Sequence, residues 1–175
     1  RHRHVDIFEA KATCGTPDNT VDLQLVQGIL GDGLIKGKGR SASGVDGLDY
    51  SVHLTGNNVQ LNTIVAAVSP GVKGDFRGFT DFTVDLNGSG TTQESFKKHL
   101  KGEGEIQIRN GTVSGLEFLQ SLASFIKVDK LDTLTFDHSH GTFRVADGLI
   151  HTTSKLMGKE MELYPEGTIS LDAYL

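Results

Sequence analysis

The chain contains few of the residues that cross-link, break or strongly anchor a fold. Its 175 residues include one cysteine, three prolines and no tryptophan. Because a single thiol has no partner within the chain, Cys14 excludes an intrachain disulfide and leaves the redox compartment open. The apolar run at residues 64–68 is far shorter than the roughly 20 residues needed to span a bilayer. No signal-peptide pattern precedes the abrupt start at Arg1, so we expect the sequence to be a piece of a longer protein.

Positive charge and catalytic motifs are also scarce. Lys and Arg total 17 against 22 Asp and Glu, a net charge of −5, so the composition gives no basis for a nucleic-acid partner. No nucleophile elbow, phosphate-binding loop or paired-histidine zinc motif is present. We therefore predict a protein that is not an enzyme, with no catalytic residue and no cofactor.

Two groups of titratable residues were weighed as sites and set aside. His138 and His140 lie on the same face of an extended segment, but a metal site needs three or four convergent ligands. A polar connection is the better interpretation, and we predict no metal. Glu103 and Glu105 alternate with isoleucines, so a solvated strand face is favoured over acid–base chemistry.

Glycine is abundant, at 22 residues without low-complexity runs, which favours many short strands joined by tight turns. One ten-residue pattern occurs twice, at residues 104–113 and 141–150. It reads Gly-x-apolar-x-apolar-x-[Asn/Asp]-Gly-x-apolar. Alternating apolar residues indicate a strand, and Asn-Gly or Asp-Gly favours a two-residue hairpin turn. We therefore predict hairpins at Asn110-Gly111 and Asp147-Gly148 within an antiparallel meander.

Short helices interrupt the strands. Apolar residues at helical spacing predict helices over residues 58–69 and 116–126, and a weaker pattern covers residues 92–100. Asn58 is the expected N-cap of the first helix, and Pro70 is expected to end it. No linker divides the chain. We predict one mainly β domain over residues 1–175, a curled, groove-like antiparallel sheet of about ten strands with two or three short amphipathic helices.

Lys36, Lys38 and Arg40 follow one another at a spacing of two and so share one strand face. Cations commonly protect a sheet edge, and we favour that interpretation. The alternative is that they attract anionic groups, such as lipid phosphates, at the rim of a site.

Roughly the last two thirds of the chain, from Leu48 onward, resembles the C-terminal region of the AsmA family of bacterial envelope proteins. Each motif alone is ordinary turn and strand sequence, and the order and spacing make the resemblance specific. The motifs are Asn58-Val59-Gln60-Leu61, Lys73-Gly74-Asp75-Phe76-Arg77-Gly78, Leu86-Asn87-Gly88-Ser89-Gly90-Thr91, Leu100-Lys101-Gly102-Glu103-Gly104, Ile108-Arg109-Asn110-Gly111, Phe143-Arg144-Val145, Asp147-Gly148 and Gly167-Thr168-Ile169-Ser170-Leu171.

The resemblance implies a periplasmic, Gram-negative protein, anchored in the inner membrane by a segment outside this sequence. It also implies a relation to bridge-like lipid-transfer proteins, and hence a role in phospholipid transport and outer-membrane assembly and integrity. The expected partners are a phospholipid or other acyl lipid and envelope membrane proteins. No catalytic residue is carried over from the family.

A sheet with one apolar face must cover it with helices, a second sheet or a ligand. Two short helices are modest cover for about ten strands, so we expect a lipid groove on that face. The alternative is a closed sandwich that serves as a structural or adhesion module without ligand. The candidate lipid-contacting residues are Ile106, Ile108, Phe143, Val145, Ile150, Leu156, Met161, Leu163, Ile169 and Leu171.

Overall fold

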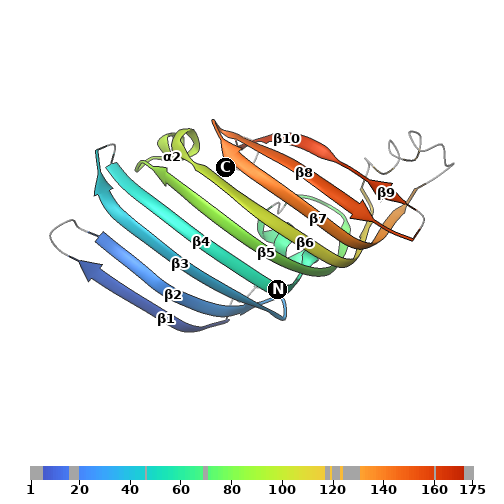
Figure 1. Ribbon diagram of the computed structural model, residues 1–175, viewed down its shortest axis with the longest axis horizontal. Coiled ribbons are helices and arrows are strands. Elements are labelled where there is room, and N and C mark those ends of the chain that lie inside the picture. The colour runs from blue at the N-terminus through green and yellow to red at the C-terminus, as the bar shows by residue number, and fades with distance from the viewer. Residues whose placement is uncertain are drawn as a thin grey trace.

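The chain folds into one antiparallel sheet of ten strands with two helices (Figure 1). The computed structural model describes residues 6–15, 20–45, 47–68, 71–116, 119, 123, 131–159 and 161–171. The elements are β1 (Asp6–Gly15), β2 (Thr20–Leu30), β3 (Gly33–Gly44), β4 (Gly47–Gln60), α1 (Leu61–Val68), β5 (Asp75–Ser89), α2 (Gln93–His99), β6 (Lys101–Ser114), β7 (Thr133–Ala146), β8 (Leu149–Met157), β9 (Glu162–Leu163) and β10 (Glu166–Ser170).

The sheet is a meander, as predicted. Strands β1 to β8 lie side by side in their sequence order, and β9 and β10 both pair with β8. The result is a single curled layer that does not close on itself (Figure 1). The predicted fold class is therefore confirmed, and the alternative of a closed sandwich is wrong.

One of the two predicted hairpin turns is confirmed. Asp147 and Gly148 have φ of 53° and 76° and form the whole connection between β7 and β8. Positive φ at both central residues is the requirement of a type I′ turn, which matches the twist of the flanking strands.

The other prediction, a hairpin at Asn110-Gly111, is wrong because β6 continues through both residues. Arg109 pairs with His138 and Gly111 with Phe136, so β7 follows β6 without interruption. On the other side the register with β5 shifts by one residue between Arg77 and Phe79. Asn110, with φ of 53°, is thus the extra residue of a β-bulge, which needs the same left-handed backbone as a turn.

Further irregularities lie beside this bulge in the neighbouring strands. The β4–β5 register shifts between Gly56 and Val59, where Asn58 has φ of 55°, and Gly78 in β5 has φ of 128°. Bulges bend a strand and increase its twist, so this row accounts for much of the local curl. Asn58 is consequently part of a strand, and its prediction as the N-cap of α1 is wrong.

The predicted helices are present where they can be followed. α1 begins at Leu61, which is 6% exposed, and the predicted end at Ser69-Pro70 lies outside the described residues. α2 is capped by Thr92, whose hydroxyl accepts a hydrogen bond from the Ser95 amide at 3.2 Å. Of the helix predicted over 116–126, Leu119 and Ala123 are helical and buried, and Leu122 and Ile126 lie outside the described residues.

Candidate functional site

The strand register sorts the side chains onto two different faces. Directly paired residues share a face, and one row that crosses the sheet contains Gly37, Leu54, Val84, Gly104 and Phe143. The next residue along each strand points the opposite way, as Thr55, Thr83 and Glu105 do. One face is therefore apolar and the other polar, as the alternation predicts.

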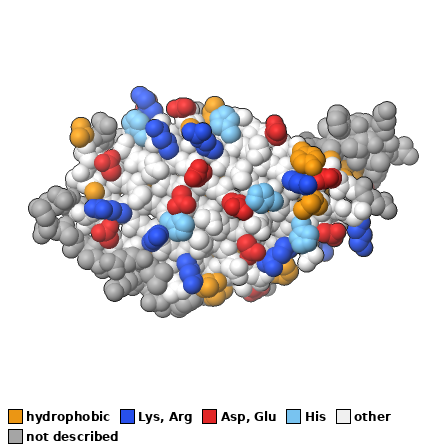
Figure 2. All heavy atoms as spheres, viewed as in Figure 1, with side chains coloured by type: hydrophobic (Ala, Val, Ile, Leu, Met, Phe, Trp, Pro, Cys, Tyr) orange, Lys and Arg blue, Asp and Glu red, His pale blue; other side chains and the backbone are white. Residues whose placement is uncertain are grey.

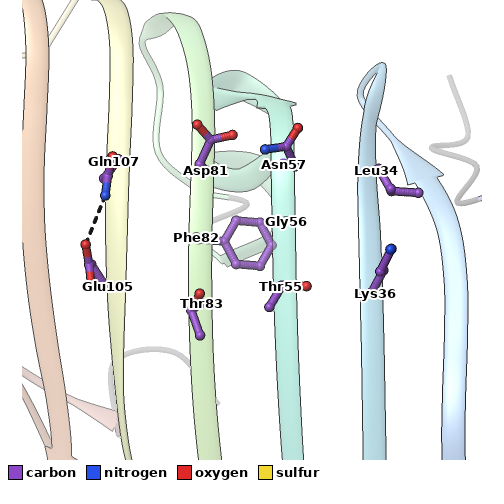
Figure 3. Close-up of a pocket in the computed structure, with 10 residues that line it drawn as sticks. All are labelled: Leu34, Lys36, Thr55, Gly56, Asn57, Asp81, Phe82, Thr83, Glu105 and Gln107. Atoms are coloured by element: carbon purple, nitrogen blue, oxygen red, sulfur yellow. Dashed lines mark hydrogen bonds between the residues drawn. The ribbon is translucent and has the colours of Figure 1, made fainter.

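Large side chains on the apolar face lie over glycines of the adjacent strand. A Cβ atom on Gly56 would collide with the Phe82 ring, one on Gly104 with Phe143, and one on Gly111 with Phe136. The close-up in Figure 3 shows the Phe82 ring beside Gly56. Many of the glycines thus lie inside strands of nine to 15 residues, which corrects the expectation of short strands with glycine mainly in turns.

At one end of the apolar face a cluster, here called the α2 cluster, packs around Leu100, Val145 and Leu171. The residues packed against these three are Tyr50, Leu86, Phe96, Phe143 and Ile150. Among them are four of the predicted lipid-contacting residues, Phe143, Val145, Ile150 and Leu171. Val145 and Leu171 are only 4% and 7% exposed, so in this conformation these two serve as core.

A second cluster, here called the β7 cluster, occupies the other end around Leu119, Leu134 and Phe136. The residues packed against it are Ile108, Val113, Leu116, Leu131, Leu156, Met161 and Leu163. Four further candidates, Ile108, Leu156, Met161 and Leu163, therefore pack protein against protein. The remaining two, Ile106 and Ile169, are half-buried on the same face and belong to neither cluster.

Between the clusters runs a band of incompletely covered apolar residues, here called the apolar strip. Leu23 is 42% exposed and Leu54 39%, and the other members are half-buried. The strip crosses β2 to β6 and consists of Leu23, Val52, Leu54, Phe82, Val84 and Ile106. The prediction included only Ile106, although the alternation at residues 52–54 and 82–84 carried the same signal.

The opposite face is densely polar, and Figure 2 shows acidic, basic and histidine side chains distributed over it. Lys36, Lys38 and Arg40 lie here, on β3, paired with Thr55, His53 and Ser51 of β4. Because β3 has partners on both sides, these cations do not protect a sheet edge, and that interpretation is wrong. They also lie on the face opposite to the ten lipid candidates.

Cross-strand ion pairs connect the polar face. His53 Nδ1 lies 2.6 Å from an Asp85 carboxylate oxygen, and Arg109 lies 3.0 Å from Asp81. Asp81 also accepts a hydrogen bond from the Asn58 amide at 2.7 Å, which holds the β4 bulge against β5. These pairs are solvent-exposed, so each contributes roughly 0–1 kcal/mol.

The sheet is also hollowed on its polar side, which the sequence did not predict. The largest hollow has a volume of about 660 Å³ and lies across β3 to β6 (Figure 3). Its polar walls include Lys36, Asp81, Glu105 and Gln107. Gln107 donates a hydrogen bond to Glu105 at 3.0 Å, so part of this lining is already satisfied internally.

Near the sheet edge, Lys155 of β8 forms an ion pair with Glu162 of β9 and lies 5.4 Å from the centre of the Tyr164 ring. Hydrogen bonding to Glu162, and then to Tyr164, raises the pKa of Lys155. The same hydrogen bond from Lys155, followed by one from Tyr164, lowers the pKa of Glu162. Both charged forms are thus favoured by the β8–β9 pairing.

Among the residues that the structure describes, no group of three or more His, Cys, Asp or Glu side chains is arranged to hold a metal ion. Glu103 and Glu105 are exposed, as predicted. Within the same described ranges, no helix combines the length and apolarity needed to cross a bilayer.

The model of the AsmA family matches residues 2–155. The chain belongs to the AsmA family. No curated protein and no solved structure matches it. The match begins well before Leu48, where the resemblance was expected to start, and it stops before β9 and β10.

AsmA-family proteins are envelope proteins of bacteria, and the family is not known for enzymatic activity. In this AsmA-family chain the match covers β1 to β7 completely and most of β8. The apolar strip and the hollowed polar face both lie within the matched region.

Proposed function

We propose that the apolar strip binds the acyl chains of a phospholipid. The observation that carries the proposal is the incomplete cover of one apolar face. Two clusters protect its ends, while Leu23 and Leu54 remain about two-fifths exposed between them. A contiguous apolar surface rimmed by polar residues is typical of an interaction site.

Acyl chains fit the chemistry of this surface. The strip consists of aliphatic side chains and one phenylalanine, with glycines at Gly37, Gly56 and Gly104 in the rows between them. Each buried methylene contributes roughly 0.8 kcal/mol, whatever the head group. A lipid held in this way binds with little selectivity for its tails.

Family membership supports an envelope role. We propose that the protein acts without catalysis in phospholipid transport and outer-membrane assembly and integrity, in the periplasm of a Gram-negative bacterium. A full-length protein anchored in the inner membrane, with other envelope membrane proteins as partners, is part of the same proposal. It rests on the AsmA assignment and on the apolar strip together.

Photocrosslinking tests the strip directly. A photoreactive residue at Leu54 is expected to capture phospholipid co-purified from bacterial membranes, detected by mass spectrometry of the adduct. The matched control is the same residue at Thr83, which is exposed on β5 and points to the polar face. Equal capture at both positions, or none at Leu54, would exclude the strip as a lipid site.

A charge placed in the strip gives an independent test. Leu54→Glu is expected to reduce co-purified lipid with a small loss of stability, because a side chain already 39% exposed lets the carboxylate reach water. Leu163→Glu, at the edge of the β7 cluster, is expected to destabilise more, since it adds a charge to packed core. If Leu54→Glu unfolds the protein as readily as Leu163→Glu, the strip is core and the proposal fails.

A further inference from the structure

The helix α2 covers the end of the apolar face with unusually little burial. Its Phe96 ring stacks on Tyr50 of β4, with ring centres 5.1 Å apart and planes 14° from parallel. No residue of the helix itself is fully buried. Leu100, immediately after it, is 6% exposed and joins the α2 cluster. The helix is therefore held mainly by one aromatic stack and by its C-cap.

Two polar atoms beneath α2 lack hydrogen-bond partners. The Tyr50 hydroxyl and the Nδ1 atom of His99 are both inaccessible to solvent and unpaired. Burial of Tyr50 also raises the pKa of its hydroxyl. The Tyr50 hydroxyl lies over Gly88, beside the His99 carbonyl oxygen. Both atoms regain water when the helix lifts, so the closed position carries a cost that the open one does not.

The chain around α2 is built to move as a unit. The capping box of Thr92 and Ser95 closes the first turn internally, through the hydrogen bonds Ser95 N to Thr92 Oγ1 and Thr92 N to Ser95 Oγ. The helix therefore does not depend on the sheet for its cap. Gly90, two residues earlier, has φ of 127°, a backbone conformation that glycine adopts freely.

The residues beneath α2 continue the apolar strip. Leu86, in the α2 cluster, is paired directly with Val52 of the strip. Phe143 lies over Gly104, which is paired with Val84. Lifting α2 thus lengthens the exposed apolar surface at the strip's end.

We propose that α2 is a lid that opens locally from the apolar face and admits lipid to the end of the strip. This inference rests on the proposed lipid function for what the lid admits, but the motion itself is independent of any ligand. The unpaired Tyr50 hydroxyl and His99 Nδ1 set how often the lid opens.

Hydrogen exchange of the purified chain without lipid tests the motion. Tyr50→Phe removes one orphaned atom and keeps the aromatic stack, so the closed lid gains stability. The amides of Phe96 and Leu100, bonded to Thr92 and Phe96 carbonyls at 2.9 and 2.8 Å, are expected to exchange about tenfold more slowly. That factor corresponds to about 1.4 kcal/mol. Phe96→Ala is expected to speed exchange of the Leu100 amide.

Tyr164→Phe is the matched control. It makes the same chemical change at a tyrosine that is 64% exposed, and whose hydroxyl donates a hydrogen bond to Glu162 at 2.7 Å. Exchange in α2 should be unchanged in this variant. Equal exchange in Tyr50→Phe and wild type would overturn the lid, as would slowing that is uniform over the whole sheet.

A second measurement separates the lid from the lipid function. Uptake of a fluorescent phosphatidylethanolamine from vesicles should slow in Tyr50→Phe, in proportion to α2 exchange, and remain normal in Tyr164→Phe. Unchanged uptake with slowed exchange would mean that lipid enters elsewhere and would overturn the lid's gating role. If no variant takes up lipid, including the wild type, the proposed function fails while the exchange result still decides whether α2 moves.

Discussion

Asparagine and aspartate perform the work at the tightest points of this backbone. The described non-glycine residues with positive φ are Asp32, Asn58, Asn110 and Asp147, with φ between 53° and 61°. Two of them, Asp32 and Asp147, lie in two-residue hairpin turns, and the other two lie at bulges. Asn and Asp tolerate this conformation better than other L residues because their short polar side chains can bond locally.

Asn110 provides the simplest test of that backbone requirement. Asn110→Ala should lower the free energy of unfolding by about 1 kcal/mol, because a methyl side chain disfavours left-handed backbone. Asn110→Gly, the control, should be neutral or slightly stabilising. Urea denaturation followed by circular dichroism measures both, and an alanine variant as stable as the glycine variant would contradict the bulge assignment.

The glycines beneath aromatic rings make a second prediction. Gly56→Ala should destabilise by roughly 1–3 kcal/mol, since the new methyl group would overlap the Phe82 ring and force a repacking. Gly167→Ala is the matched control, because its Cβ would lie 3.5 Å from Thr152 Oγ1, an ordinary contact. The control should be neutral or stabilising. Thermal unfolding of the two variants side by side decides between packing and a general effect of glycine.

Among the elements, the short β9 strand depends on an exposed ion pair, and its pairing should respond to pH. The lowered pKa of Glu162 gives a contribution that is complete above the ordinary carboxyl pKa of about 4.3. It is lost as the pH falls through the lowered value. The raised pKa of Lys155 gives one that is complete below about 10.4 and is lost as the pH rises further.

The β8–β9 pairing should therefore be constant around neutrality and weaken at both extremes. Amide chemical shifts of Glu162 and Leu163 report the pairing by NMR. Glu162→Gln should abolish the acidic transition at these amides. Glu166→Gln, which alters an exposed carboxyl on β10, should leave that transition intact.

The sequence predicted some elements well because one face of this sheet is solvated. In β5 the apolar residues at 82, 84 and 86 alternate with charged and hydroxyl residues, so the pattern itself reports the two faces. The β2–β3 hairpin at Gly31-Asp32 was missed. In β3, Gly37 and Gly39 occupy the apolar face between Lys36, Lys38 and Arg40, so alternation is between glycine and charge.

Turns and bulges could not be separated from the local sequence. Asn110-Gly111 and Asp147-Gly148 have similar chemistry, and both first residues have φ of 53°. What differs is the continuation, since residues 111–114 find partners on both β5 and β7. That choice depends on long-range pairing. The site residues were likewise placed on the correct face by alternation, while cover by α2 and by the β7 cluster required the tertiary structure.

At the scale of the whole molecule, stability should be uneven across the sheet. From β1 to β8 each strand pairs only with its neighbours in sequence, and both described clusters lie over β4 to β10. Structures built in this way approach a one-dimensional array, in which an end can open alone. Amides of β2 and β3 are therefore expected to exchange in low denaturant well before those of β6 and β7.

Native-state hydrogen exchange over a series of urea concentrations measures this order. A single shared opening free energy for β2 and β7 would contradict it. A lipid bound on the apolar strip, which extends over β2 and β4, should bring the two ends closer in protection.

The spacing of the strands limits how much cargo the apolar strip holds. From β2 to β6 there are four inter-strand steps, each about 4.8 Å, so the strip is about 19 Å wide across the strands. A bilayer's hydrocarbon core of about 30 Å holds two layers of tails, so one tail occupies about 15 Å. A tail laid across the strands would therefore occupy nearly the full width of the strip. The domain is sized for a single lipid molecule at a time, with its capacity set by the number of strands rather than by the volume of an enclosed cavity.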